Sequence, residues 1–158
     1  MRVVPVSVSV ALLVGIFLAP GLADAVCLDP KTAISGYHVP LREEIHSSAA
    51  IAVGRVVAER EVPDPDYPEY VKATIYSVRI DKVLNGRLPQ LVKLRTENDS
   101  GRYPMDVGEK HVLFLTPLPR GLGADYFADS CGSSSLLPAG ETIVRQVQAS
   151  MNSTRHAP

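Results

Sequence analysis

The chain has 158 residues, of which 16 are Lys or Arg and 17 are Asp or Glu, so its formal net charge is −1. This near neutrality argues against a basic nucleic-acid-binding protein and against polybasic binding to membranes. Apolar residues make up 46% of the chain, which suits one globular domain with its own core and excludes a disordered protein.

The amino end has the pattern of a secretory signal peptide. After a short positive start, residues 6–18 are mainly apolar, and Ala23 and Ala25 are the small residues that signal peptidase requires for cleavage before Val26. An uncleaved anchor is the alternative, but a membrane span needs roughly 20 apolar residues and this run is shorter. We therefore predict a signal peptide at residues 1–25 and a secreted or periplasmic protein that has no stable membrane insertion after cleavage.

The two cysteines, Cys27 and Cys131, allow at most one internal disulfide. In an oxidising compartment they can pair, which would close a loop of more than a hundred residues and stabilise the fold by roughly 4–5 kcal/mol in the chain-entropy model. Two buried free thiols are the alternative. For a secreted chain we favour the disulfide.

Residues 41–45 favour a short helix with apolar side chains at a spacing of four. Residues 50–59 are predicted to form a strand. At its start the side chains that point to either face are apolar, which is typical of a strand buried on both faces. Gly54 within this strand marks a bulge or a close approach of another backbone. The three prolines of residues 63–68 predict a stiff acidic loop, and residues 70–84 form a long strand.

In that long strand the apolar residues change face midway, as expected of a bulged, curved strand that serves two sides of a barrel. A turn is predicted at residues 85–86. The remaining expected elements are strands at 91–96, 111–115 and 125–131, a helix at 140–151 and a flexible tail at 152–158.

Five strands with little helix predict an all-β fold. The best match is a five-stranded OB-fold-like closed barrel over residues 26–151, with a short N-terminal helix and a C-terminal helix.

Several short motifs follow one another in order along the chain: V-G-R-V at 53–56, K-V-L-N-G at 82–86, V-K-L-R-T at 92–96, V-G-E-K-H-V-L-F-L at 107–115 and D-S-C at 129–131. This order resembles that of the bacterial relatives of the tissue inhibitors of metalloproteinases, in the netrin-like OB-fold group. The resemblance covers roughly residues 27–137.

Members of that family begin with Cys-x-Cys, whose first cysteine coordinates the protease's zinc and pairs with the cysteine of a C-G-x-x-F motif. Here Cys27 is the one N-terminal cysteine, and the matching motif is S-G-R-Y at 100–103. Both halves of one disulfide are therefore missing together, which supports pairing of Cys27 with Cys131.

The resemblance implies a non-enzymatic module that binds a protein partner, and inhibition of a secreted metalloendopeptidase is its most specific form. We expect the contact ridge at Val26, Cys27, Ser130 and Cys131, with the 63–68 loop beside it. An envelope structural module is one alternative function.

Catalytic and metal-binding patterns are weak. The four histidines, His38, His46, His111 and His156, have no metal-ligand spacing, so we expect no metal site and no cofactor. His111 begins a buried run and is interpreted as structural. A secreted hydrolase using Ser130, Ser134 or His111 is the other alternative, but the G-x-S-x-G elbow is absent and we predict no enzyme activity.

Single-stranded nucleic acid is a common ligand of OB-folds. Several basic residues could gather on the predicted second and third strands: Arg79, Lys82, Arg87, Lys93, Arg95 and Arg102. Acidic residues dilute them elsewhere, and a secreted protein rarely meets nucleic acid. We therefore expect no nucleic-acid partner.

Overall fold

The computed structural model describes residues 27–29, 31–99 and 101–155, so the predicted signal peptide and Val26 lie outside the described residues. The elements of the described chain are α1 (Leu41–Ser47), β1 (Ala50–Pro63), β2 (Val71–Asn85), β3 (Leu91–Glu97), β4 (Lys110–Pro117), β5 (Tyr126–Phe127), β6 (Ser135–Leu136) and α2 (Glu141–Arg155). Neither of the two helices in this part of the chain has the length and apolar character that crossing a membrane requires.

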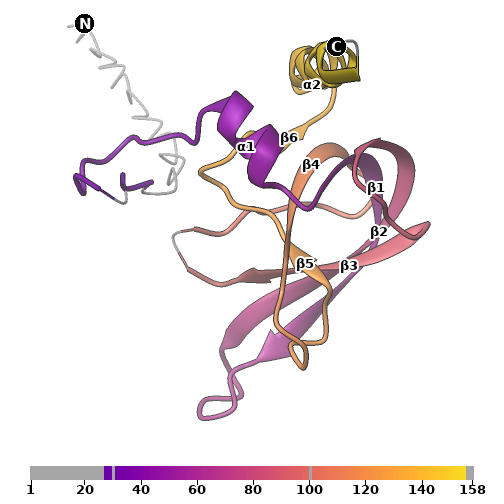
Figure 1. Cartoon of the computed structure of the whole chain (residues 1–158). Helices are drawn as coiled ribbons and strands as arrows, with labels where there is room; N and C mark the ends of the chain where they lie inside the picture. Colours follow the sequence, from indigo (N-terminus) through magenta and orange to yellow (C-terminus); the bar gives the residue numbers. More distant parts are fainter. Residues whose placement is uncertain (1–26, 30, 100, 156–158) are drawn as a thin grey trace, which may run out of the picture.

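Five strands close into a barrel in the order β1-β2-β3-β5-β4, because β4 pairs with β1 as well as with β5 (Figure 1). The barrel is mixed, since β3 and β5 run parallel, with Leu94 opposite Tyr126. β6 is an additional strand that pairs with the start of β4. This architecture confirms the predicted OB-fold-like closed barrel with one N-terminal and one C-terminal helix.

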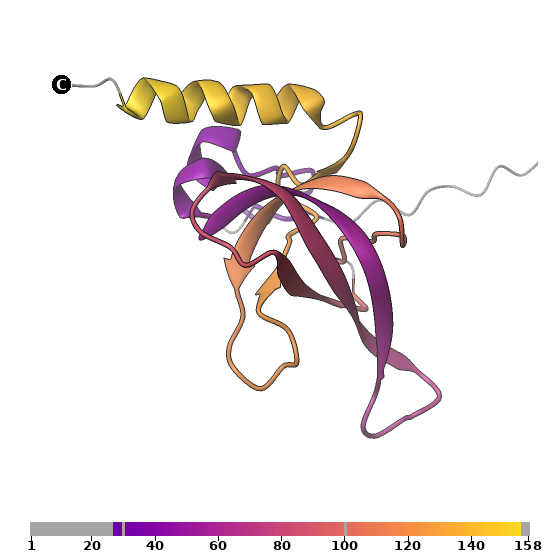
Figure 2. The same cartoon turned by 90° about the vertical axis from the view of Figure 1, so that its right-hand side faces the viewer.

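β1 and β2 form a long hairpin whose tip, residues 64–70, projects beyond the barrel (Figures 1 and 2). Their pairing contains several register shifts, one of them at Gly54. A Cβ atom at Gly54 would lie 2.6 Å from Cγ1 of Val78 and 3.0 Å from the carbonyl oxygen of Arg79. Gly54 therefore allows the close approach that the sequence predicted, and the shifts bend the hairpin around the barrel.

The apolar core has two parts because β1 and β4 bury both of their faces. The barrel interior is filled by Val56, Tyr76, Val78, Val92, Leu94, Met105, Leu113, Leu115 and Ala128. A second cluster lies between the outer face of these strands and the two helices: Ile45, Ile51, Val53, Val112, Phe114 and Val147. Figure 2 shows α2 lying across this end of the barrel, over α1. The continuous apolar runs of both strands follow from this double burial.

The C-terminal third differs from the sequence-based expectation in two places. The strand predicted over residues 125–131 is limited to β5, because Oδ1 of Asp129 accepts a hydrogen bond from the amide of Cys131 at 2.8 Å and turns the chain away. The last helix continues through Arg155, into the segment expected to be a tail.

Candidate functional site

A disulfide joins the N-terminal segment to the turn that follows β5. Cys27 and Cys131 are bonded, with their Cα atoms 5.4 Å apart, and Cys27 is buried. This confirms the predicted pairing. The bridge connects residues separated by 104 positions and so ties the segment before α1 to the turn after β5.

Backbone hydrogen bonds hold the same segment on both sides of the bridge. The amide of Tyr37 donates to the carbonyl of Cys27 at 3.1 Å, and the amide of Val39 donates to the carbonyl of Cys131, also at 3.1 Å. Residues 27–39 therefore form a closed loop that is anchored to the 129–134 turn rather than a loose arm.

This loop presents apolar side chains to solvent. Leu28 is 54% exposed and Ile34 is 67% exposed. Leu28 lies in an isolated β-bridge with Ser35, and Oδ1 of Asp29 accepts hydrogen bonds from the amides of Lys31 and Thr32. The loop is thus internally hydrogen-bonded while the side chains of Leu28 and Ile34 remain exposed.

We define the disulfide ridge as Cys27, Leu28, Ile34, Ser130 and Cys131. Of the residues expected to form the contact surface, Cys27 and Cys131 are bonded, and the half-buried Ser130 has its Oγ 4.0 Å from Sγ of Cys131. Val26 lies outside the described residues. The 63–68 loop, expected beside the ridge, instead lies at the far end of the β1–β2 hairpin, because that hairpin projects away from α1 (Figures 1 and 2).

Glu44 binds the turn that carries Cys131, which the sequence did not predict. Its carboxylate, on the buried face of α1, accepts a hydrogen bond from the amide of Ser133 at 2.7 Å. Gly132 leaves room for it, since a Cβ atom there would overlap the carboxylate. Burial raises the pKa of Glu44, while the bonds from Ser133 lower it and the charge of Asp129 raises it. The sequence signal that could have indicated this role is the position of Glu44 directly before Ile45, an apolar residue of the predicted helix.

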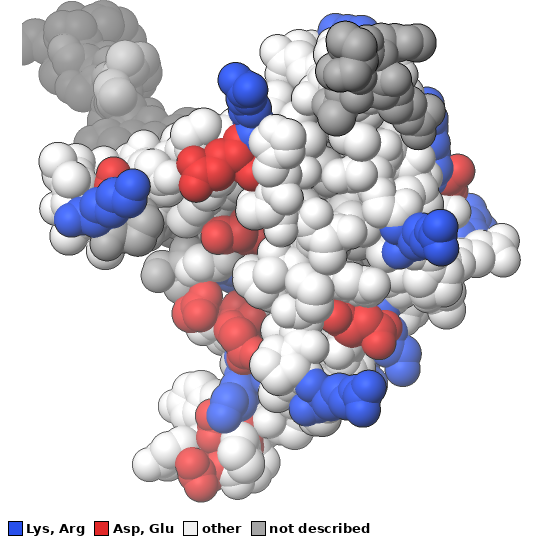
Figure 3. All heavy atoms as spheres, viewed as in Figure 1, with Lys and Arg blue, Asp and Glu red and all other residues white. Residues whose placement is uncertain are grey.

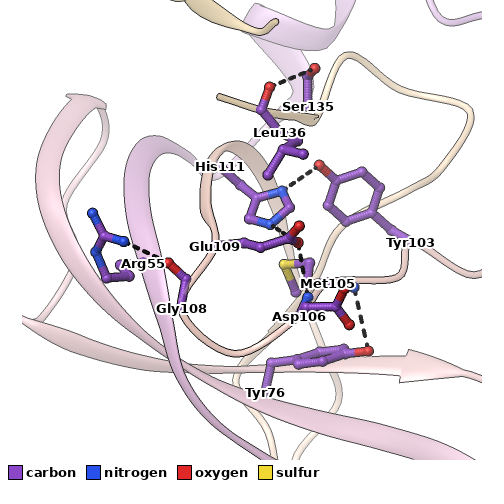
Figure 4. A network of polar contacts seen from close by, with 10 residues as sticks. All are labelled: Arg55, Tyr76, Tyr103, Met105, Asp106, Gly108, Glu109, His111, Ser135 and Leu136. Carbon is purple, nitrogen blue, oxygen red and sulfur yellow. Dashed lines mark hydrogen bonds and ion pairs between the residues drawn. The ribbon is translucent and has the colours of Figure 1, made fainter. Parts of the chain in front are cut away.

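A second polar cluster surrounds His111 on β4 (Figure 4). The hydroxyl of Tyr103 lies 3.0 Å from Nδ1 of His111, and Nε2 lies 3.2 Å from Oε2 of Glu109. That carboxylate also accepts a hydrogen bond from the amide of Asp106 at 2.9 Å. The cluster connects the 103–109 loop to the start of β4.

The directions of the pKa shifts in this cluster suit a structural role. Burial lowers the pKa of His111, although the nearby Glu109 and Asp106 oppose this effect. Burial, with the charge of Glu109, raises the pKa of Tyr103. A neutral His111 therefore donates from Nε2 to Glu109 and accepts at Nδ1 from the Tyr103 hydroxyl.

Ser134 forms no hydrogen bond with His111 in this arrangement. Ser134 and His111 line the same cavity, of about 420 Å³, but both ring nitrogens of His111 are engaged with Tyr103 and Glu109. Oγ of Ser134 instead accepts a hydrogen bond from the amide of Phe114 at 3.0 Å. The geometry therefore gives no support to a Ser134–His111 pair as the active site of a hydrolase.

Two of the other three histidines lie at the surface. His38 and His46 are exposed, and His156 lies outside the described residues. In the part of the chain that the structure describes, no three His, Cys, Asp or Glu side chains are grouped so that they could hold a metal ion.

Charge is mixed over the visible face of the molecule. Figure 3 shows basic and acidic side chains interleaved on this face rather than one continuous basic patch. Lys110 forms an ion pair with Asp81 at 2.9 Å, and Arg95 forms one with Glu97. Basic residues on the strands are thus partly compensated by neighbouring carboxylates.

Comparison with known proteins leaves the family open: no protein-family model and no curated protein matches this chain.

Proposed function

We propose that this chain is an OB-fold protein-binding module, without enzyme activity, that acts in the secreted or periplasmic space. Its contact surface is the disulfide ridge. The observation that carries the proposal is the exposure of Leu28 and Ile34 on a loop that a disulfide and backbone hydrogen bonds hold in place. Exposed aliphatic side chains on a pre-ordered loop favour association, because little conformational entropy is lost when a partner covers them.

Two observations support the location. The disulfide between Cys27 and Cys131 is typical of proteins that fold in an oxidising compartment. The residues before Val26 match a cleavable signal peptide. Both fit export from the cytoplasm.

The partner that we propose is a secreted metalloprotease, because the order of the motifs resembles that of the bacterial relatives of the tissue inhibitors of metalloproteinases. The chain has a single N-terminal cysteine where that family has Cys-x-Cys. We therefore propose inhibition by surface contact at the ridge rather than by a pre-organised zinc-binding terminus.

The test is an inhibition assay with the purified, disulfide-bonded protein and a panel of secreted metalloproteases, using a fluorogenic peptide as substrate. We expect a concentration-dependent slowing of hydrolysis by at least one protease. The double substitution L28S/I34S should weaken inhibition about tenfold to a hundredfold, because two aliphatic side chains no longer become buried on binding.

L91S is the matched control, since Leu91 is also about half exposed, at 52%, but lies on β3. We expect it to inhibit like the wild-type protein. No slowing of any protease at high excess would reject the metalloprotease partner. Equal inhibition by L28S/I34S and the wild-type protein would reject the ridge as the contact surface.

A further inference from the structure

A cavity of about 340 Å³ opens where β3 and β5 separate beyond their paired position at Leu94 and Tyr126. We call it the β3–β5 cavity. Its lining comes from the end of β3 and the loop after it, from the residue that follows β4, and from the end of β5 with the segment after it: Arg95, Thr96, Glu97, Asp99, Gly101, Leu118, Phe127, Ala128 and Asp129. Its size suits one long side chain rather than a large cofactor.

The cavity and the disulfide ridge meet at the turn after β5. Asp129 lines the cavity and also accepts the hydrogen bond from the amide of Cys131. Asp129 of the cavity and Cys131 of the ridge are thus neighbours in one turn.

The charges around the cavity are not balanced. Arg95 is almost fully buried and its guanidinium is engaged, with the carboxylate of Glu97 and with the carbonyl of Leu122 at 3.2 Å. Asp99 and Asp129 form no ion pair within the described part of the chain. Arg95 and Glu97 neutralise each other, so Asp99 and Asp129 are the charged lining residues without an ion-pair partner among the described residues.

Both carboxylates are held in position by backbone groups. Oδ1 of Asp99 accepts a hydrogen bond from the amide of Gly101 at 2.9 Å, and Oδ1 of Asp129 accepts one from the amide of Cys131 at 2.8 Å. Among the described residues, no hydrogen bond is formed to the second oxygen of either carboxylate. A bound cation would not have to order flexible side chains first, which reduces the entropy lost on binding.

The remaining walls are apolar, since Leu118, Phe127 and Ala128 contribute carbon atoms to the lining. A ligand that suits both parts has an aliphatic stem and a positively charged end. Lysine and arginine side chains combine these properties, because their methylene groups bury against apolar surface while the charged group reaches polar partners.

We propose that the β3–β5 cavity binds a lysine or arginine side chain of the partner protein. The inference rests on the proposed function, because it places a second contact beside the disulfide ridge. The stem of the side chain lies against Phe127 and Leu118, and its charged end lies between Asp99 and Asp129.

The test is an NMR titration of the isotope-labelled, disulfide-bonded protein at low salt with N-acetyl-lysine N-methylamide. N-acetyl-norleucine N-methylamide, which has the aliphatic chain without the charge, is the comparison probe. We expect the lysine probe to shift the backbone amides of residues 95–99 and 127–129 in a saturable way, and the norleucine probe to bind more weakly. Added salt should weaken binding of the lysine probe.

Substitution of both carboxylates tests the role of charge. In D99N/D129N the side-chain oxygen can still accept the backbone hydrogen bond, so the loops should keep their conformation while the affinity for the lysine probe falls about fivefold. D64N is the matched control. Oδ1 of Asp64 also accepts a backbone hydrogen bond, from the amide of Asp66 at 2.8 Å, but lies in the distant hairpin tip. D64N should bind the probe like the wild-type protein.

Each remaining outcome rejects the inference. Equal binding of both probes would show an apolar hollow without charge selection. Unshifted amides around the cavity, or unchanged binding by D99N/D129N, would show that the cavity does not bind a basic side chain. The probe binds without the partner protein, so such a result would reject the cavity site without testing the disulfide ridge. The L28S/I34S inhibition assay tests the ridge separately.

Discussion

Two titratable side chains, Glu44 and His111, hold loops against the barrel, and burial acts on their pKa values in opposite directions. Glu44 binds the turn that carries Cys131, and burial raises its pKa. His111 binds the 103–109 loop, and burial lowers its pKa. The ionised form of each group is thus less favoured in the folded protein than in the unfolded chain, so ionisation of Glu44 lowers stability as the pH rises and ionisation of His111 lowers it as the pH falls.

The pH dependence of stability should reveal His111. Its folded-state pKa is below the ordinary value of 6.5, so its contribution to stability is present above pH 6.5 and is lost as the pH falls through the folded-state pKa. We expect the free energy of unfolding, measured in urea, to decrease in this range for the wild-type protein. In H111Q this part of the decrease should be missing, even if the variant is less stable at every pH.

Because Glu44 contributes with the opposite sign, the comparison between H111Q and the wild-type protein is needed to isolate the histidine. An NMR titration of the His111 ring gives an independent measurement. Identical pH profiles for the two proteins, or a ring that titrates above 6.5, would contradict the assignment.

At the level of elements, β1 and β4 explain most of the fold. Their continuous apolar runs predicted burial on both faces, and the barrel interior on one side and the two helices on the other provide it. The last predicted strand, at 125–131, was wrong in length because periodicity alone does not show that Asp129 turns the chain. β6 was missed because two residues are too few to produce a pattern.

Gly54 gives a direct test of the β1–β2 packing. In G54V the added side chain must displace Val78 or the backbone of Arg79, which lie 2.6 and 3.0 Å from the position of a Cβ atom. We expect a loss of at least about 1–3 kcal/mol in the free energy of unfolding, measured in urea. V57T, at an exposed position of the same strand, should change it by less than about 0.5 kcal/mol. Equal stability of G54V and V57T would show that the strands do not approach closely here.

At the level of the whole molecule, the disulfide connects the segment before α1 with the turn between β5 and β6. It places the 27–39 loop and the 129–134 turn in one surface, while the β1–β2 hairpin carries the 63–68 loop to the opposite end (Figures 1 and 2). The proposed ridge and the β3–β5 cavity both depend on this arrangement, because Asp129 and Cys131 belong to the same turn.

Removal of the bridge should therefore lower stability and loosen the ridge. We expect C27S/C131S to lose up to about 4–5 kcal/mol in the free energy of unfolding, the chain-entropy value for so long a loop. Hydrogen exchange at the amides of Tyr37 and Val39 should become faster, because the carbonyls that they bond are those of the two bridged residues.

Treatment of the wild-type protein with a reductant should reproduce both effects, and the same treatment of C27S/C131S should change nothing. If the double variant kept the stability and the exchange rates of the wild-type protein, this result would show that the disulfide does not hold the 27–39 loop in place.

The prediction of strands, turns and the disulfide succeeded because these features depend on neighbouring residues or on the simple count of cysteines. The alternation of apolar residues, the Asn85–Gly86 turn and the two cysteines are visible without knowledge of how the sheet closes. The site required the tertiary structure. Contact between Glu44 and Ser133, the cluster around His111 and the β3–β5 cavity each bring together side chains from separate segments. Closure of the barrel decides which segments become neighbours, and no local pattern of side chains records that choice.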